Sequence, residues 1–277
     1  MNSKNEPISF DRAADYYDST RGFPAGVAEQ ITTALFNYTQ KAVTQTPVHL
    51  LEIGVGTGRI AAPCLAQGYF LTGIDLSWNM MEKFHQVLIE KSRTFRGTLL
   101  GLAQADASLL PFAPQSFDAV LAVHVLHLIY EWQDVIQESR RVTRPGGSLI
   151  VGYEGRSPNS PISLLREKFD EILLTYGISQ RRILKRDYSD VDQYMLDQGC
   201  SSSECSGAEW TTTTSVAGDI EKLTRRIWSS TWDIPDDIYT EGISKLKSWA
   251  FDTYGDLHEK RRAPHRFVWK IYTWPKP

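Results

Sequence analysis

The sequence of 277 residues predicts a doubly wound α/β fold, with helices on both faces of a mostly parallel sheet. First, short apolar runs alternate with helical patterns between residues 48 and 154, and this alternation is typical of parallel sheets. Second, one apolar run leads at residue 54 into three alternating glycines, and a helical pattern follows at once. Third, the next apolar run, 70–75, ends in an acidic residue.

The first half of the chain supports this fold element by element. An apolar stripe predicts a helix over 24–40, with Pro24 in its first turn. Ser77 is a suitable N-cap for a later helix, and Pro145-Gly146-Gly147 should end the last helix of this half. The other expected elements are strand 48–53, helix 57–67, strand 70–75, helix 77–91, strand 98–104, strand 117–123, helix 132–143 and strand 148–154.

After residue 154 the pattern changes. Residues 156–161 have the composition of a linker, and an apolar face that includes Leu165 and Phe169 predicts a helix over 162–176. The remaining expected elements are a short helix near 191–196, a β-rich edge at 210–214, helices over 219–230 and 236–252, and a final strand at 266–272.

The glycine turn predicts a site for a nucleotide. Gly54, Gly56 and Gly58 let the backbone turn sharply and approach a ligand closely, since no Cβ stands in the way. Strand, turn and helix N-terminus together form a nucleotide-binding corner. Asp75 follows about 20 residues later, where a carboxylate accepts hydrogen bonds from ribose hydroxyls. Residues 56–61 also fit the dinucleotide pattern G-x-G-x-x-A, so an NAD(P) site stays open as an alternative.

Several segments, taken in order, resemble one family. They are Phe10–Asp18 with Arg21, the strand and turn from Leu50 to Arg59, Asp75, Ala105–Ala107, Phe117–Ala122 and Arg141–Gly147. On these segments the chain resembles the class I S-adenosylmethionine (SAM)-dependent methyltransferases of the small-molecule type. Within them it is similar to methyltransferase type 11 and to the enzymes of ubiquinone and menaquinone biosynthesis. The resemblance implies a Rossmann-like sheet of seven strands, SAM as the cofactor and a small-molecule methyl acceptor.

The resemblance also implies which residues contact the cofactor. Glu52 and Asp106 favour SAM over NAD(P), because the family carries carboxylates at both places; Asp106 is otherwise a turn residue. Leu76 and Met80 would sandwich the adenine or be ordinary packing. Arg21 would pair its forked guanidinium with the methionine carboxylate, or be a surface arginine. The expected cofactor-binding residues are Tyr17, Arg21, Glu52, Gly54, Gly56, Gly58, Asp75, Leu76, Met80, Asp106, Ala107 and His124.

Two histidines follow the strand at 117–123. His124 begins the loop that should face the sulfur of the cofactor, and its side chain titrates near neutrality, so it is the candidate general base. A core histidine is the alternative. His127 is expected to be structural. The attacking atom of the acceptor (O, N, C or S) is not predicted, and quinone-type rings are suggested by the resemblance alone.

The resemblance divides the chain into three parts. Residues 1–154 would form the SAM-binding domain with its N-terminal flap, 155–198 a helical lid, and 199–277 the strands and helices that complete the sheet and the acceptor pocket. A lid over the methyl group would exclude water. Candidate lining residues, if they are not core, are Phe169, Tyr176, Trp228, Trp232 and Trp249.

Composition argues against several classes of function. A net charge of −3 gives no basic field for nucleic acid, and the Asn/Asp-Pro-Pro-aromatic signature of base methylation is missing after residue 123. The N-terminus is no signal peptide, and no apolar run approaches the roughly 18 residues that span a bilayer, so a cytoplasmic protein is expected. The three cysteines predict neither a disulfide framework nor a metal site.

Two other functions stay open at this point. One is an NAD(P)-dependent oxidoreductase on a similar sheet, and the other is a non-catalytic protein that binds SAM or its product S-adenosylhomocysteine. The oligomeric state is not predicted.

Overall fold

The computed structural model describes residues 8–42, 48–155, 157, 159–179, 184 and 188–275. The described residues fall into two compact units. The first unit takes its residues from Met1–Glu154, Ile183–Ala208 and Phe267–Pro277, and the second from Gly155–Arg182 and Glu209–Arg266.

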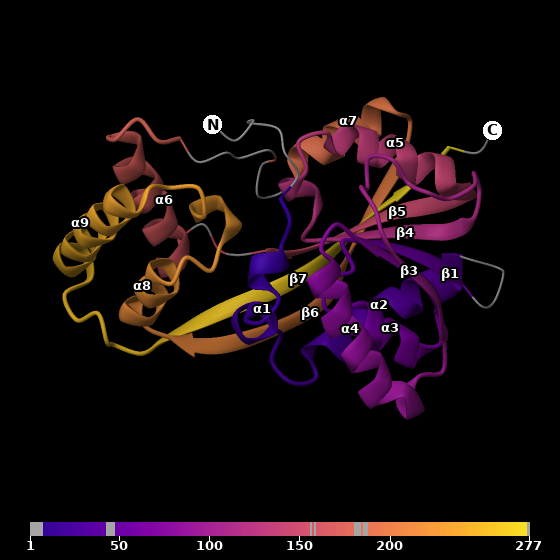
Figure 1. Cartoon of the computed structure of the whole chain (residues 1–277), viewed down its shortest axis with the longest axis horizontal. Coiled ribbons are helices and arrows are strands. Elements are labelled where there is room, and N and C mark those ends of the chain that lie inside the picture. The colour runs from indigo at the N-terminus through magenta and orange to yellow at the C-terminus, as the bar shows by residue number, and fades with distance from the viewer. Residues whose placement is uncertain are drawn as a thin grey trace. The chain divides into compact units, whose positions relative to one another are not determined.

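Seven strands form one sheet, in the order β3-β2-β1-β4-β5-β7-β6 (Figure 1). Their bounds are β1 His49–Ile53, β2 Phe70–Asp75, β3 Thr98–Gln104, β4 Phe117–Val123, β5 Thr143–Gly155, β6 Ser201–Thr214 and β7 Arg261–Thr273. The pairs β1–β2, β1–β4, β2–β3 and β4–β5 are parallel. The strand order reverses between β1 and β4, which makes this the switch point of the sheet. The predicted mostly parallel, seven-stranded Rossmann-like sheet is confirmed.

Helices of the first unit cover both faces of the parallel strands. In Figure 1, α5 and α7 lie on one side of the sheet and α2 and α3 on the other. Successive side chains of β1 point to opposite faces of the sheet. Those of Leu51 and Ile53 pack into the core formed with α5 and α7. The helices are α1 Tyr17–Arg21, α2 Val27–Ala42, α3 Ala61–Gln67, α4 Trp78–Lys91, α5 Trp132–Val142 and α7 Ser189–Asp197, with short 3-10 turns η1 Asp11–Ala13, η2 Ser92–Thr94 and η3 Leu126–Leu128.

Most element bounds lie within two residues of the predicted ones. Larger differences occur at the starts of α2, β6 and β7, which lie at Val27, Ser201 and Arg261 where 24, 210 and 266 were expected. Two more differences have a clear physical reason. The helix expected over 57–67 begins only at Ala61, because Gly58 still has a φ of 78°. The strand expected at 148–154 begins at Thr143, directly where α5 ends. Pro145-Gly146-Gly147 therefore does not end the helix. It lies inside β5, where the register against β4 shifts by several residues.

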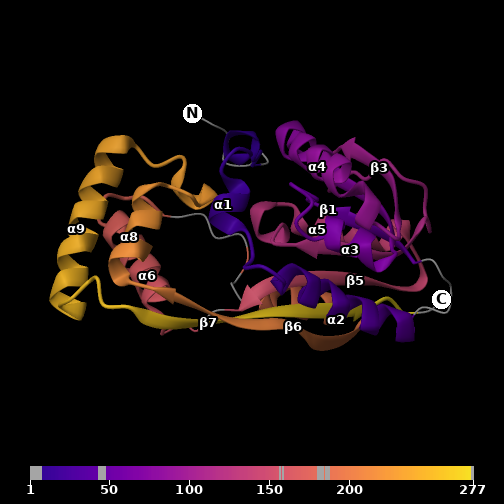
Figure 2. The same cartoon turned by 90° about the horizontal axis from the view of Figure 1, so that it is seen from below.

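Three helices make up most of the second unit: α6 Pro161–Leu174, α8 Val216–Thr224 and α9 Asp236–Tyr254, with the short turn η4 Ser229–Thr231 (Figure 2). Their facing side chains form a separate apolar core, with Leu165, Phe169 and Leu246 almost fully buried. The helix expected over 219–230 is shifted, since α8 already ends at Thr224.

The compact units divide the chain differently from the three expected ranges. Helix α7, expected inside the 155–198 lid, contributes Val191 and Met195 to the core of the first unit. The second unit instead combines α6 with α8 and α9. The chain passes between the units within β6 and again before the end of β7.

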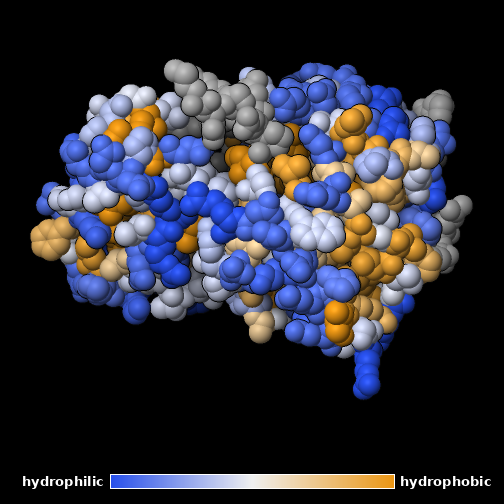
Figure 3. All heavy atoms as spheres, in the orientation of Figure 1, coloured by the Kyte–Doolittle hydropathy of each residue, from blue (hydrophilic) through white to orange (hydrophobic). Residues whose placement is uncertain are grey.

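The surface of the first unit shows an apolar area where β3 lies (Figure 3). Leu100 of this edge strand is 50% exposed. No helix among the described residues is both long and apolar enough to cross a membrane.

Candidate functional site

The turn after β1 is built around three glycines with positive φ. The φ angles of Gly54, Gly56 and Gly58 are 69°, 55° and 78°, a region that residues with a Cβ rarely adopt. A Cβ on Gly58 would overlap the Phe84 ring of α4, which shows how closely that helix packs on the turn. The Val55 amide, between the first two glycines, donates to the carbonyl of Ile74 in β2 at 2.9 Å. The turn is therefore held against the end of the neighbouring strand.

Asp75, the last residue of β2, closes this corner from the other side. Its Oδ2 accepts a hydrogen bond from the Gly56 amide and its Oδ1 one from the Ser77 amide, both at 2.8 Å. Burial raises the pKa of this carboxyl, while the two amide donors lower it. Because a carboxylate has about four acceptor sites, both oxygens keep capacity for further donors.

Glu52 lies under the glycine turn and is 2% exposed. Its Oε2 is buried and has no hydrogen-bond partner among the described residues. Burial raises the pKa of this carboxyl to about 8; the charge of Arg59 opposes that rise and the charge of Asp75 adds to it. A buried polar oxygen without a partner is costly, so Glu52 is the strongest sign that this corner takes a ligand.

The N-terminal segment lies against both sides of the corner. Asp11 Oδ1 accepts from Ser77 Oγ at 2.5 Å, at the start of α4, and hydrogen bonds from serine lower the pKa of Asp11. Asp18 accepts from the Thr57 hydroxyl at 2.6 Å, inside the glycine turn.

Basic and aromatic side chains also join the N-terminal segment to the glycine turn. Arg59, just after the turn, donates to the carbonyl of Arg21. Its guanidinium lies 4.3 Å from the centroid of the Phe23 ring. The guanidinium groups of Arg21 and Arg59 are each 5.9 Å from the Tyr17 ring centroid. Tyr17 and Arg21 are thus brought next to the glycine turn.

The residues expected at the adenine differ in their surroundings. Met80 is buried, and its Cε would lie 3.3 Å from a Cβ on Gly56, whereas Leu76 is only half-buried. Asp106 is exposed, and its Oδ1 accepts from both the amide and the hydroxyl of Ser108 at 2.8 Å, as a turn residue would. Ala107 packs into the core.

The loop after β4 lies against the glycine turn. A Cβ on Gly54 would come within 2.8 Å of the Val125 side chain. His124 has a φ of 52°, and its amide donates to the carbonyl of Gly152 in β5 at 3.1 Å. The His124 ring meets the edge of Phe267, with 5.9 Å between centroids. The structure thus brings the predicted base close to the corner.

Several contacts at this site were not expected from the sequence. His127, expected to be structural, has its Nδ1 3.1 Å from the hydroxyl of Tyr188, 61 residues away. Asp11 and Asp18 lie in the N-terminal segment that carries the resemblance, yet nothing in their spacing indicates Ser77 or Thr57 as partners. Arg59 directly follows the last glycine, and that position is the only signal that could have singled it out.

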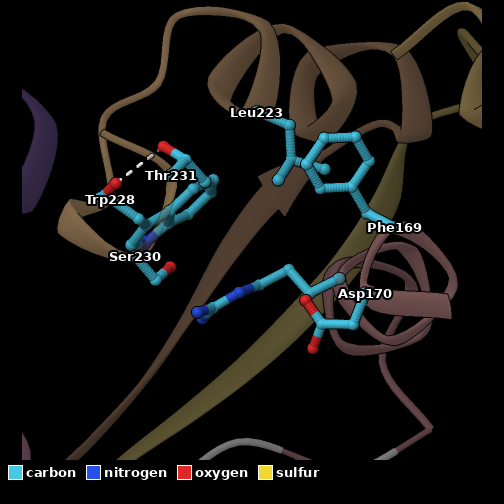
Figure 4. A pocket seen from close by; sticks show the side chains of 7 residues that line it. Phe169, Asp170, Leu223, Trp228, Ser230 and Thr231 are labelled. Carbon is cyan, nitrogen blue, oxygen red and sulfur yellow. Dashed lines mark hydrogen bonds between the residues drawn. The ribbon is translucent and has the colours of Figure 1, made fainter. Parts of the chain in front are cut away.

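The second unit carries a hollow of its own (Figure 4). Phe169 and Leu223 lie at its apolar side, and the Arg166 guanidinium is 5.0 Å from the Trp228 ring centroid. The Thr231 hydroxyl donates to the carbonyl of Trp228 at 2.7 Å. Two of the candidate lining residues, Phe169 and Trp228, therefore line the same hollow of this unit, and Phe169 is also part of its apolar core. Among the described residues, no group of three or more His, Cys, Asp or Glu side chains is placed to hold a metal ion.

Comparison with known proteins identifies the part of the chain that carries this corner. Residues 51–151 match the family described as "Methyltransferase domain". Over this range the chain is similar to methyltransferase domains. The matched range includes the last three residues of β1, the glycine turn, Asp75, Asp106 and the loop after β4.

Proteins similar to this part of the chain occur in several bacteria. The chain is 27% identical over 153 residues to the phosphatidylethanolamine N-methyltransferase of Cereibacter sphaeroides, covering 54% of this chain and 71% of that protein. It is 33% identical over 102 residues to the demethylmenaquinone methyltransferase of Tropheryma whipplei, covering 37% and 40%. A ubiquinone/menaquinone biosynthesis C-methyltransferase of Paracoccus denitrificans is 29% identical, covering 58% and 63%. In the last two, the match spans less than two thirds of the relative.

Solved structures share the fold. The YcgJ protein of Bacillus subtilis superposes with a TM-score of 0.57 at 16% identity, covering 88% of this chain and 99% of that one. A methyltransferase-like protein of Bacillus halodurans gives the same TM-score at 15% identity, covering 88% and 100%. At this level of identity the likeness shows the architecture alone.

Proposed function

We propose that this protein is a SAM-dependent methyltransferase that moves a methyl group to a small-molecule acceptor. The observation that carries the proposal is the corner formed by Glu52, the glycine turn and Asp75, in which a buried carboxyl oxygen has no hydrogen-bond partner within the described part of the chain. The similarity to methyltransferase domains over residues 51–151 supports it. So do the named activities of the relatives, whose methyl acceptors are lipids and quinones.

The residues present fit SAM. A cationic cofactor suits the orphan oxygen of Glu52, because a nearby positive charge favours the ionised carboxylate. The remaining acceptor sites of Asp75 suit ribose hydroxyls. Gly56 leaves room for close approach where a side chain would press on Met80. When bound, SAM supplies a methyl group on a positively charged sulfur, and the protein supplies binding and orientation.

The remaining predicted residues complete the proposed cofactor site. The set is Tyr17, Arg21, Glu52, Gly54, Gly56, Gly58, Asp75, Leu76, Met80, Asp106, Ala107 and His124. The hydrogen bonds from Ser77 to Asp11 and from Thr57 to Asp18 would hold the N-terminal segment beside the cofactor and reduce its contact with water. His124 stays a prediction as general base. We further propose a neutral small molecule as acceptor and a cytoplasmic location.

Calorimetry with SAM, S-adenosylhomocysteine and NADH tests the cofactor. We expect saturable, roughly micromolar binding of the first two, about −8 kcal/mol, and none of NADH. Tight binding of NADH without SAM would favour the oxidoreductase. Binding of SAM without methyl transfer to any of a panel of phenols, quinols and amines would favour a non-catalytic binding protein.

The substitution Asp75→Asn tests the site. It keeps the size of the side chain but removes the charge that makes each hydrogen bond to ribose worth about 1.5–3 kcal/mol rather than about 1 kcal/mol. We expect SAM affinity to fall from tenfold to several hundredfold. An exposed carboxyl elsewhere, Glu29 on α2, supplies the matched control Glu29→Gln. Unchanged SAM affinity in Asp75→Asn would show that the cofactor lies elsewhere.

A further inference from the structure

The corner after β1 holds carboxylates of the chain itself at two places where a nucleotide can carry phosphates. Residues 56–61 fit the dinucleotide pattern G-x-G-x-x-A, and in folds of this type a pyrophosphate lies at the turn and the helix N-terminus after it. The 2′-phosphate of such a ligand lies beside the end of the second strand. The pattern alone therefore leaves open whether the corner accepts phosphate.

Asp18 of α1 lies at the first of these two places, the glycine turn. Its Oδ1 accepts a hydrogen bond of 2.6 Å from the hydroxyl of Thr57, which lies between Gly56 and Gly58. A hydroxyl group in the turn is a donor that a phosphate oxygen can use as well. Carboxylate and phosphate have the same sign of charge and need the same donor, so they compete for this place.

Asp11 lies at the second place, the start of α4. Its Oδ1 accepts from Ser77 Oγ at 2.5 Å and from the Asn79 amide at 3.2 Å. Ser77 is the N-cap of α4 and Asn79 lies in its first turn, where the backbone amides and the helix dipole attract anions. Since the Ser77 amide also donates to Asp75, Asp11 borders the carboxylate proposed to hold the ribose.

The charges of these two aspartates oppose a further negative group. Hydrogen bonds from Ser77 and Ser9 lower the pKa of Asp11, so its side chain is negative at neutral pH. Burial raises the pKa of Asp75, and the charge of Asp11 adds to that rise, so the two carboxylates interact. Asp11 and Asp18 are both exposed, so their charges act on a ligand that arrives from solvent. A phosphate meets repulsion there, whereas a positively charged sulfur is attracted.

Two guanidinium groups beside the turn would otherwise attract phosphate. Those of Arg21 and Arg59 each lie 5.9 Å from the centroid of the Tyr17 ring. Arginines next to a glycine turn and a helix N-terminus have the chemistry of an anion site. Asp18 directly follows Tyr17, and its carboxylate offsets this positive charge.

We propose that Asp11 and Asp18 are specificity-determining residues that fill the two phosphate positions of the corner and restrict it to nucleosides without phosphate. The inference rests on the proposed function, in which this corner binds SAM. Asp18 excludes a pyrophosphate at the glycine turn, and Asp11 excludes a 2′-phosphate beside the ribose. The N-terminal segment thereby converts a corner of the dinucleotide type into a site for a positively charged nucleoside.

Calorimetry with three adenosine compounds tests each aspartate separately. The probes are adenosine, ADP and adenosine 2′-phosphate, and the quantity compared is the Kd of each phosphate compound divided by the Kd of adenosine. In Asp18→Ala the ratio for ADP should fall at least about tenfold relative to the wild type. In Asp11→Ala the ratio for adenosine 2′-phosphate should fall at least about tenfold. Dividing by the Kd of adenosine removes any general weakening of the site in a variant.

Asp15 supplies the matched control. It lies on the same segment, and its 90% exposed side chain pairs with the ammonium of Lys83 at 2.9 Å instead of with a donor of the turn or of the first turn of α4. Asp15→Ala removes an equal charge, and both ratios should stay within about twofold of the wild type.

The milder variants Asp11→Asn and Asp18→Asn cover the case in which an alanine variant does not fold. They keep the size of the side chain and one acceptor oxygen and remove only the charge. Each should lower its ratio at least about threefold, which is less than the alanine variants because the donors stay occupied.

The outcomes separate this inference from the proposed function. If the wild type bound neither SAM nor S-adenosylhomocysteine, the proposed function would fail and the inference with it. If the wild type bound them and the ratios stayed unchanged in the folded variants of Asp11 and Asp18, the inference alone would fail. It would also fail if the wild type bound ADP as tightly as adenosine, or if Asp15→Ala lowered the ratios as much as the other alanine variants.

Discussion

Replacing Glu52 by glutamine isolates the cost of a carboxyl group buried in the unliganded site. The group is 2% exposed and its Oε2 has no partner among the described residues. Burial raises its pKa from 4.5 to about 8. Between these two values the folded protein holds a proton that the unfolded chain has released, so the stability of the fold must fall as the pH rises.

The magnitude follows from the two pKa values. Each pH unit between them is worth about 1.4 kcal/mol. Between about pH 5.5 and pH 8 the wild type should therefore lose roughly 3 kcal/mol from this group alone. Glutamine has nearly the same shape and does not titrate, so Glu52→Gln should lack this part of the pH dependence. Its buried amide keeps an unpartnered polar group, which shifts its stability by a similar amount at every pH.

The assay is urea unfolding of wild type and Glu52→Gln at both pH values, without ligand. At each pH, the free energy of unfolding of the wild type is subtracted from that of the variant. This difference should be about 3 kcal/mol larger at the higher pH than at the lower one. Glu29→Gln, at an exposed glutamate of α2, is the control and should follow the wild type. If the stability of Glu52→Gln depended on pH in the same way as that of the wild type, the raised pKa of the buried Glu52 carboxyl would be refuted.

Three further predictions follow from the same corner. If bound SAM keeps Glu52 ionised, the affinity of the wild type for SAM should rise by up to about tenfold per pH unit until about pH 8. Calorimetry should show no such rise in Glu52→Gln. Equal pH dependence in both proteins would contradict a contact between SAM and Glu52. Gly58→Ala should lower the free energy of unfolding by roughly 2–5 kcal/mol, since the added Cβ meets Phe84 at a positive φ; urea unfolding checks this, and a loss under 1 kcal/mol would contradict it. Ser77→Ala removes the hydroxyl that accepts from the Met80 amide at 3.2 Å and donates to Asp11, and it should cost at least about 1 kcal/mol. Thermal unfolding measures this cost, and no change would show that neither hydrogen bond contributes to stability.

Local pattern was enough for much of this fold. The strands at 70–75, 98–104 and 117–123 have the predicted bounds, because turn-forming residues on either side of each apolar run mark where the strand begins and ends. The glycine turn and Asp75 were predicted as a corner for a related reason. Glycine, which tolerates positive φ, and a carboxylate at a strand end are properties of single positions and can be read from the sequence.

Tertiary structure decided which side chains meet. His127 and Tyr188 are 61 positions apart, and no local sequence pattern links them, so their contact arises only when α7 packs beside β5. The same holds for Asp18 and Thr57, 39 residues apart. Pro145-Gly146-Gly147 would end a helix in isolation, yet it lies inside β5, where the pairing with β4 changes register.

Glu52 shows, at a single residue, what the sequence determines and what only the tertiary structure decides. The sequence by itself determined that a carboxyl lies within the apolar run of β1, at the place where the resembling family carries one. Only the packed structure decided that this carboxyl is buried with one oxygen unpartnered and a pKa raised to about 8. Burial and hydrogen bonding depend on what other elements bring to the same place, and these long-range contacts leave no periodic trace along the chain.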